Sequence, residues 1–344
     1  MRIFLNHHRS QRPRIGIFGI SLFALFLSPY SAGTETDAPH CKYASLATLP
    51  IQNVRNQLIV HGSINGKATD MLLDTGAQIT TVTNLGVEKL GLPMFHSQLT
   101  TIGVGGESRT YETTVDEMAL DRFKTSHRSR FLVAMNSSVT YNVIVAADML
   151  FNADIEFNLA DHYVKLLEPT NCDDAVLAYW DKNASEAPLS EISSIDHRQV
   201  VTVEINGQKI RALIDSGAQY SILNLAAAAR LGITPESPGV KKVGLGGGFG
   251  AHMTEVWISQ FDNFAIGDEL VKNPTLRIMD LWGAAQSDMV NFSRDISSGG
   301  DPEMLLGADF LSAHRVLLAL SQRRIYFTYN GGALFPKEVD APYH

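Results

Sequence analysis

Short apolar stretches separated by turn signals run along the chain and predict strands in preference to long helices. Two of them, LIVHGSI at residues 58–64 and VVTVEI at residues 200–205, alternate well enough for half-buried strands. Each is followed by an Asn-Gly pair, at residues 65–66 and 206–207. Asn-Gly is typical of a two-residue hairpin turn because both positions adopt positive φ. The pattern therefore predicts two β-hairpins in corresponding places of the chain.

The two hairpins belong to an internal repeat. SINGKATDMLLDTGAQ at residues 63–78 aligns with EINGQKIRALIDSGAQ at residues 204–219, with eight of sixteen positions identical at a constant offset of 141. A Leu-Gly pair follows in both copies, at residues 90–91 and 231–232. Gly in that position suits the end of a short helix. We therefore predict two mainly β domains with one or two short helices each.

A later apolar segment also recurs, but at a different offset. IVAADML occupies residues 144–150 and LLGADFL residues 305–311, an offset of 161. The second copy therefore carries about twenty extra residues, best placed within 279–301, where Gly, Ser and Asp are frequent. Such a stretch suits a surface loop, and the sequence leaves open whether it contacts substrate.

The first 33 residues carry all three parts of a secretory signal peptide. Residues 1–14 contain four Arg and no acid, residues 15–27 form a 13-residue apolar run, and residues 31–33 offer a small-x-small cleavage pattern. The run is short for a membrane span, so we predict cleavage and no stable span afterwards; an uncleaved anchor is the alternative. The predicted location is periplasmic or secreted. The predicted layout is a signal peptide at 1–33, a first lobe at 34–170, a polar linker at 171–195 and a second lobe at 196–335.

Composition and charge narrow the class of protein. The 344 residues are 45% hydrophobic, enough for two domains with their own cores. The formal net charge is −8, and it becomes −12 without residues 1–33, which hold four Arg and no acid. No run of Lys or Arg is present, which argues against a nucleic-acid partner.

The only two cysteines, Cys41 and Cys172, flank the first domain. Both lie in the part predicted to be exported, where disulfides persist, so we expect a bridge; two free thiols are the alternative. No CxxC or Cys/His cluster has the spacing of a zinc site. The sequence implies no metal and no organic cofactor.

Two carboxylates in matching contexts are the central chemical feature. Asp74 and Asp215 each end an apolar run and precede a small hydroxyl residue and Gly. A single buried carboxylate would simply be protonated. If a pseudo-two-fold arrangement brings both strand ends together, two carboxylates about 3 Å apart hold one proton between them. Such a pair can deprotonate a water and protonate a carbonyl oxygen, which is general acid–base attack on an amide.

The residues around each aspartate have predicted supporting roles. The hydroxyls of Thr75 and Ser216 can hydrogen-bond locally or across to the other copy, and the glycines that follow permit a tight turn. Glycine-rich segments about thirty residues later, TIGVGGES and VGLGGGFG, are predicted to form flaps over the site. Ordinary β-turns are the alternative for these segments. The glycines are Gly76 and Gly217 beside the aspartates, and Gly103, Gly105, Gly106, Gly244, Gly246 and Gly247 in the flaps.

With LLDTGAQ, LIDSGAQ, the glycine-rich segments and LLGADFL, the chain resembles the retropepsin-like aspartic peptidases, as an exported bacterial protein with two such domains in tandem. The resemblance implies an all-β fold of two acid-protease β-barrel lobes related by pseudo-two-fold symmetry. It implies that Asp74 and Asp215 are the catalytic pair. It also implies a hydrophobic-hydrophobic-Gly element beside each aspartate loop, at residues 305–307 and, with Ala in place of Gly, at residues 144–146.

We therefore predict an aspartic endopeptidase that binds an extended peptide or protein substrate, partly as an added strand. The main alternative keeps the fold without catalysis, as a periplasmic peptide-binding module with a protease-like cleft. Pairing of each domain with its twin in a second molecule and an envelope scaffolding role are further alternatives. The covalent tandem favours a monomer whose two lobes form an intrachain pseudo-dimer.

Overall fold

The structure is a computed structural model that describes residues 41–125, 128–135, 139–248, 250, 252–283 and 301–335. The predicted signal peptide and most of the predicted extra loop lie outside the described residues. Within the described portion, no helix is both long enough and apolar enough to span a membrane.

Strands dominate both halves of the chain, as the sequence predicts. The first half contains β1 Lys42–Val54, β2 Gln57–Ile64, β3 Lys67–Leu73, β4 Thr81–Thr83, α1 Asn84–Leu90, β5 Phe95–Gly103, β6 Gly106–Val115, β7 Met118–Leu120, β8 Phe123–Thr125, β9 Ser129–Ala134, β10 Val143–Val145, α2 Ala147–Leu150, β11 Asp154–Asn158 and β12 Tyr163–Thr170. The second half contains β13 Ser185–Ser193, β14 Asp196–Ile205, β15 Gln208–Ile214, β16 Ile222–Asn224, α3 Leu225–Arg230, β17 Lys241–Gly246, β18 Thr254–Gln260, β19 Asn263–Ile266, β20 Glu269–Lys272, β21 Thr275–Met279, β22 Met304–Leu306, α5 Ala308–Ala313, β23 His314–Ala319, the 3-10 helix η1 Leu320–Gln322 and β24 Arg324–Tyr329.

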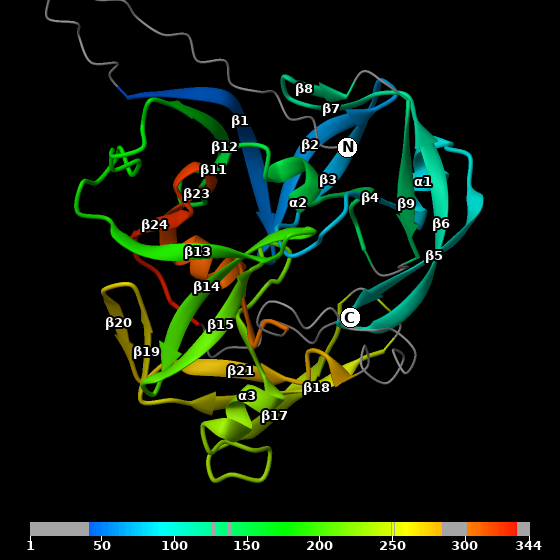
Figure 1. Cartoon of the computed structure of the whole chain (residues 1–344). Helices are drawn as coiled ribbons and strands as arrows, with labels where there is room; N and C mark the ends of the chain where they lie inside the picture. Colours follow the sequence, from blue (N-terminus) through cyan, green and yellow to red (C-terminus); the bar gives the residue numbers. More distant parts are fainter. Residues whose placement is uncertain are drawn as a thin grey trace, which may run out of the picture. The chain divides into compact units, whose positions relative to one another are not determined.

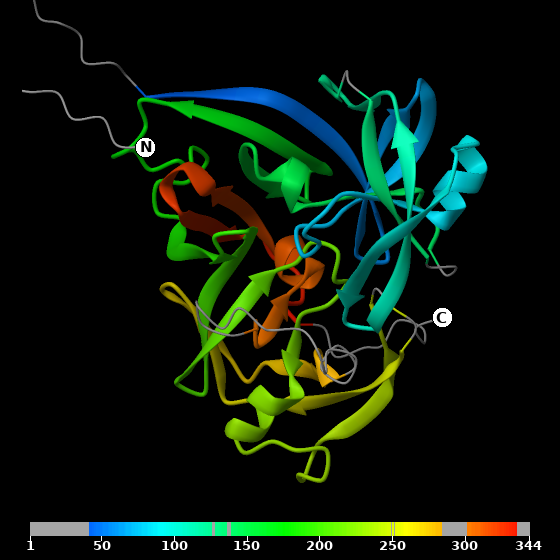
Figure 2. The ribbon, with the colours of Figure 1, turned by 45° about the vertical axis from the view of Figure 1, so that its right-hand side comes forward.

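The two halves have the same strand pairing and form two lobes (Figures 1 and 2). In the first lobe the hairpin β2–β3 is followed in the sheet by β10, which runs parallel to β3 and antiparallel to β4. In the second lobe the hairpin β14–β15 is followed by β22, which runs parallel to β15 and antiparallel to β16. The predicted all-β, two-lobe fold is confirmed.

A six-stranded antiparallel sheet joins the lobes. Its strand order is β1, β12, β11, β23, β24, β13, with three strands from each half of the chain. The central seam pairs Ile155 of β11 with Leu318 of β23. Because backbone hydrogen bonds cross this seam, the relative position of the two lobes is set by main-chain pairing as well as by side chains.

The predicted local signals have the expected geometry. Both Asn-Gly turns carry positive φ at both positions, with φ of 50° and 76° at Asn65-Gly66 and 50° and 74° at Asn206-Gly207. Gly91 follows α1 with φ of 66°, and Gly232 lies just beyond α3 with φ of 81°. These left-handed glycines end both short helices where the Leu-Gly pairs predict.

The structure differs from the sequence prediction in the linker at residues 171–195. Residues 185–193 form strand β13, which pairs with β14 and with β24. Ala187 and Leu189 are buried on one face of this strand. Within the strand only these two buried apolar positions alternate, among Ser, Glu and Pro. The segment therefore has the composition of a linker although nine of its residues form a strand.

A disulfide joins Cys41 and Cys172, with their Cα atoms 4.5 Å apart. It links the residue before β1 to the segment after β12, next to the pair formed by Lys42 and Thr170. The bridge therefore fastens an outer edge of the joining sheet to the connection between the lobes.

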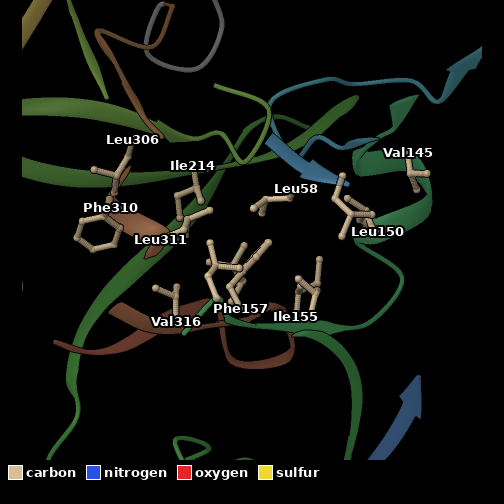
Figure 3. Close-up of a cluster of buried hydrophobic side chains, with 14 of the residues drawn as sticks. Leu58, Val145, Leu150, Ile155, Phe157, Ile214, Leu306, Phe310, Leu311 and Val316 are labelled. Atoms are coloured by element: carbon tan, nitrogen blue, oxygen red, sulfur yellow. The ribbon is translucent and has the colours of Figure 1, made fainter. Parts of the chain in front are cut away.

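One hydrophobic core runs beneath both lobes (Figure 3). Leu58, Ile155 and Phe157 contribute from the first half of the chain, and Ile214, Phe310 and Val316 from the second. All of these side chains are almost completely buried. The lobes therefore share a packed interior under the strand ends that carry the two aspartates.

Phe157 lies at the centre of this shared core and is 1% exposed, so Phe157→Ala should remove many contacts and leave a cavity. We expect the free energy of unfolding to fall by about 3–5 kcal/mol. Phe123→Ala is the matched control because Phe123 is 39% exposed, and its effect should stay within about 0.5 kcal/mol. Urea denaturation followed by tryptophan fluorescence measures both variants. If both variants lost the same free energy of unfolding, Phe157 would not be part of a core shared by the two lobes.

Candidate active site

Asp74 and Asp215 lie at corresponding ends of two pairs of parallel strands. Asp74 follows β3, and its backbone N–H donates to the carbonyl of Val145 in β10 at 3.0 Å. Asp215 follows β15, and its N–H donates to the carbonyl of Leu306 in β22, also at 3.0 Å. The residues before them, Leu73 and Ile214, are fully buried. Each apolar strand thus places its aspartate at the edge of the core.

The loop after each aspartate wraps around its carboxylate. The backbone N–H groups of Gly76 and Ala77 donate to Oδ1 of Asp74 at 3.0 and 2.9 Å. Those of Gly217 and Ala218 donate to Oδ1 of Asp215, both at 3.0 Å. One oxygen of each carboxyl group is therefore fixed by two main-chain donors.

Thr75 and Ser216 lock the two loops together across the lobes. The Thr75 hydroxyl donates to the carbonyl of Ile214 at 2.8 Å and accepts the N–H of Ser216 at 2.9 Å. The Ser216 hydroxyl donates to the carbonyl of Leu73 at 2.8 Å and accepts the N–H of Thr75 at 3.0 Å. Both side chains have no exposed surface. These four reciprocal hydrogen bonds, here called the interlobe grip, satisfy every polar atom involved.

The glycines next in sequence permit the approach of the two carboxyl groups. A Cβ atom on Gly76 would lie 2.2 Å from Cγ of Asp215, and one on Gly217 would lie 2.3 Å from Cγ of Asp74. No side chain fits at either position. Each glycine therefore lets the carboxyl group of the other lobe lie directly against its loop. The structure therefore brings together all six residues that the sequence singles out around the aspartates.

Burial and mutual proximity change the acidity of the pair. Burial, followed by the negative charge of Asp215, raises the pKa of Asp74 to about 7. Burial also raises the pKa of Asp215, while the N–H groups of Ala218 and Gly217 and then the charge of Arg198 act in the opposite direction. Asp74 and Asp215 are each half-buried as whole residues. Burial and like charge therefore oppose ionisation of both carboxyl groups at once.

Two further aspartates, which the sequence alone did not single out, bind residues that follow the two aspartate loops. Oδ1 of Asp148 accepts hydrogen bonds from the N–H and hydroxyl of Thr80 at 3.0 and 2.6 Å. Oδ1 of Asp309 accepts the same two bonds from Ser221 at 2.8 and 2.6 Å. The Ala-Asp pair that ends IVAAD and LLGAD in both copies was the available signal.

The Ala that replaces Gly in the first copy fits its position. A Cβ on Gly307 would lie 2.6 Å from the backbone carbon of Tyr220. Ala146 occupies the corresponding position with a similar backbone and is completely buried. Its neighbour Ala147 still donates to the carbonyl of Ala77 at 3.0 Å. The first lobe therefore accommodates one methyl group where the second lobe leaves no space.

The glycine-rich segments approach each other from the two lobes. Gly103 pairs with Gly106 at the end of the hairpin β5–β6. Gly105 forms a parallel bridge with Gly250, and the N–H of His252 donates to the carbonyl of Gly105 at 3.0 Å. Val104 packs against apolar side chains of the second lobe. In the second lobe the contact lies a few residues beyond the predicted glycines, of which Gly244 and Gly246 belong to β17 and Gly247 follows it.

Among the residues described, no set of three or more His, Cys, Asp or Glu side chains is grouped as a metal ion would require. The chemical groups that the site itself offers are two adjacent carboxyl groups with raised pKa values and the fixed main-chain donors around them.

Ser216→Ala should weaken the interlobe grip, because it leaves the buried N–H of Thr75 without its acceptor. We expect a loss of about 1–3 kcal/mol in the free energy of unfolding. Ser216→Thr is the matched control, since Thr75 shows that a threonine hydroxyl can make the reciprocal bonds. Thermal and urea denaturation measure both variants. A Ser216→Ala variant as stable as Ser216→Thr would show that the hydroxyl contributes nothing to joining the lobes.

Comparison with known proteins gives the family. The family model described as aspartyl protease matches residues 60–144 and 201–310. No curated protein sequence matches the chain significantly. Among solved structures, basic 7S globulin from soybean is similar over 82% of this chain and 94% of that chain, with 11% sequence identity and a TM-score of 0.39. Because the two matched regions cover more than half of the sequence and each contains one repeat, the chain belongs to the aspartyl protease family, with two retropepsin-like copies in tandem.

Proposed function

We propose that the protein is an aspartic endopeptidase in which Asp74 and Asp215 act together on one peptide bond. The observation that carries the proposal is the close approach of their carboxyl groups, which come from two different lobes: a Cβ on Gly76 would lie 2.2 Å from Cγ of Asp215, and one on Gly217 would lie 2.3 Å from Cγ of Asp74. The interlobe grip supports it, because it holds the two loops in a fixed relation that a binding surface alone would not need.

The proposed reaction uses the single shared proton. The ionised carboxylate takes a proton from a water molecule, whose oxygen attacks the carbonyl carbon of the scissile amide, while the protonated carboxyl gives its proton to the carbonyl oxygen. A tetrahedral diol forms. The amide nitrogen then takes a proton from the Asp74–Asp215 pair, here called the dyad, and one hydroxyl of the diol returns its proton to the dyad as the C–N bond breaks. The acid and amine products leave, and the dyad again holds one proton.

The substrate is proposed to be an extended peptide or protein segment lying between the dyad and the flaps. The backbones of the two glycine-rich segments meet at Gly105 and Gly250, so that main-chain groups of both lobes are available to such a segment. We further propose that the unit acts as a monomer after export, with lobes at 34–170 and 196–335. The joining sheet and the disulfide, which suits a periplasmic or secreted protein, support this.

Asp74→Asn and Asp215→Asn should each abolish cleavage of a diverse peptide library, by at least about 100-fold, because a single carboxyl group cannot serve as both acid and base. Asp121→Asn is the control: Asp121 is an exposed turn residue with φ of 53°, which Asn tolerates. Mass spectrometry of the products measures the rate.

Two results would contradict the shared site. Half of the activity in each variant would indicate two independent sites. Peptide binding by the unmodified protein with no cleavage at any pH would favour the peptide-binding module instead. Circular dichroism of each variant separates a lost active site from a lost fold.

The pH dependence of cleavage should show a decline on the alkaline side. The pKa of Asp74 is raised to about 7, so the dyad loses its last proton as the pH rises through that value. The general acid is then missing and kcat/KM should fall about tenfold per further pH unit. Initial rates measured over a wide pH range test this. At each pH, the enzyme is returned to the pH of highest activity to confirm that the loss of activity is reversible. A rate that keeps rising into alkaline solution would exclude the shared-proton mechanism.

A further inference from the structure

Arg198 connects the second lobe to the aspartate loop of the first. Its Nη1 donates to the carbonyl of Gly76 at 2.9 Å. Its Nε lies 2.9 Å from Oδ1 of Asp196, and its Nη2 lies 2.6 Å from Oδ2 of the same side chain. The guanidinium is thus held by a bidentate ion pair on one side and by a main-chain carbonyl on the other. Both charged side chains are mostly buried, at 23% and 12% exposure.

The residue that this cation binds lies between the two carboxyl groups: the N–H of Gly76 donates to Asp74, and a Cβ on Gly76 would lie 2.2 Å from Cγ of Asp215. The positive charge of Arg198 acts to lower the pKa of Asp215. A positive charge close to one of two neighbouring carboxyl groups favours ionisation of that one over the other.

In the first repeat no cation occupies the position equivalent to Arg198. At the offset of 141 that relates the repeats, the position of Arg198 is occupied by Gln57 and that of Asp196 by Arg55. The strand registers agree with this alignment, because Ile59 pairs with Leu72 as Val200 pairs with Leu213. The main-chain surroundings of the dyad are therefore nearly symmetric, while the charge beside it is not.

The other titratable groups near the dyad do not place a second positive charge beside Asp74. Tyr141, from the loop before β10, faces Asp74; burial and that negative charge raise the pKa of its hydroxyl, which stays neutral. Asp196 from β14 is held by Arg198 itself. His197 points outward and pairs with Glu191 at the surface.

Resting on the proposed peptidase function, we infer that Arg198 is a positioning residue that makes the two aspartates inequivalent, keeping the negative charge on Asp215 and the shared proton on Asp74. Asp215 then takes the proton from the attacking water, and Asp74 gives its proton to the substrate carbonyl oxygen.

The first experiment measures the pH profile of kcat/KM in Arg198→Gln. Without the cation, Asp215 takes up its proton at higher pH, so the acidic limb should move up by about one pH unit. The alkaline limb, which reports the proton on Asp74, should move less. Arg198→Lys keeps the charge and should leave the acidic limb near its original position. Arg324→Gln, which removes a charge from an exposed ion pair with Glu186 in the same lobe, is the control and should move neither limb.

The second experiment needs no activity. Carbon-13 NMR of labelled aspartate carboxyls gives the pKa of Asp215 in Asp74→Asn and that of Asp74 in Asp215→Asn, each with and without Arg198→Gln. The Arg198→Gln change should raise the pKa of Asp215 by about one unit or more and that of Asp74 by clearly less. The same spectra report whether each variant is folded.

The outcomes separate the inference from the proposed function. Equal shifts of both carboxyl groups, or none, would overturn the role of Arg198 whatever the enzyme does. A protein that cleaves no peptide but shows the unequal shifts would overturn the proposed function and leave the charge asymmetry standing. A uniform fall in kcat/KM at all pH values, with both limbs in place, would reduce Arg198 to a structural contact and overturn the inference.

Discussion

The interlobe grip between Thr75 and Ser216 is the constraint on which the rest of the structure depends. Its hydroxyls and main-chain groups are completely buried, so each would carry a desolvation penalty if its partner moved away. Breaking any of its hydrogen bonds is therefore unfavourable. When it is formed, the backbones of the two loops are so close that only glycine fits at positions 76 and 217.

Holding two carboxyl groups together in this way opposes folding, because burial and like charge both disfavour ionisation. The fold offsets the cost with interactions that lie outside the site. Main-chain pairing between β11 and β23 joins the two lobes. The core around Phe157 and Phe310 contains side chains from both lobes. The raised pKa of Asp74 reflects that cost. In the proposed reaction, the same shift keeps a proton on the dyad for transfer to the substrate.

The sequence predicts the parts of this structure that depend on local chemistry. The Asn-Gly turns, the glycines after the helices and the two Asp-Thr/Ser-Gly loops are recognisable because each needs a particular residue type. Strand β13 was missed because its pairing depends on partners far along the chain, β24 above all. Arg198 was missed for a related reason: its importance comes from the carbonyl of Gly76, which the other lobe places beside it.

A covalent tandem removes a restriction that identical subunits would impose. Two identical chains paired about a symmetry axis must present the same side chains to both carboxyl groups. Here the halves differ where the difference has chemical consequences: Arg198 matches Gln57, and Gly307 matches Ala146. The interlobe grip and the strand pairing are the same in both lobes. The charged residue next to the dyad is present in the second lobe only. Because acid and base catalysis require opposite protonation states at the same moment, such an arrangement can dedicate one aspartate to each task.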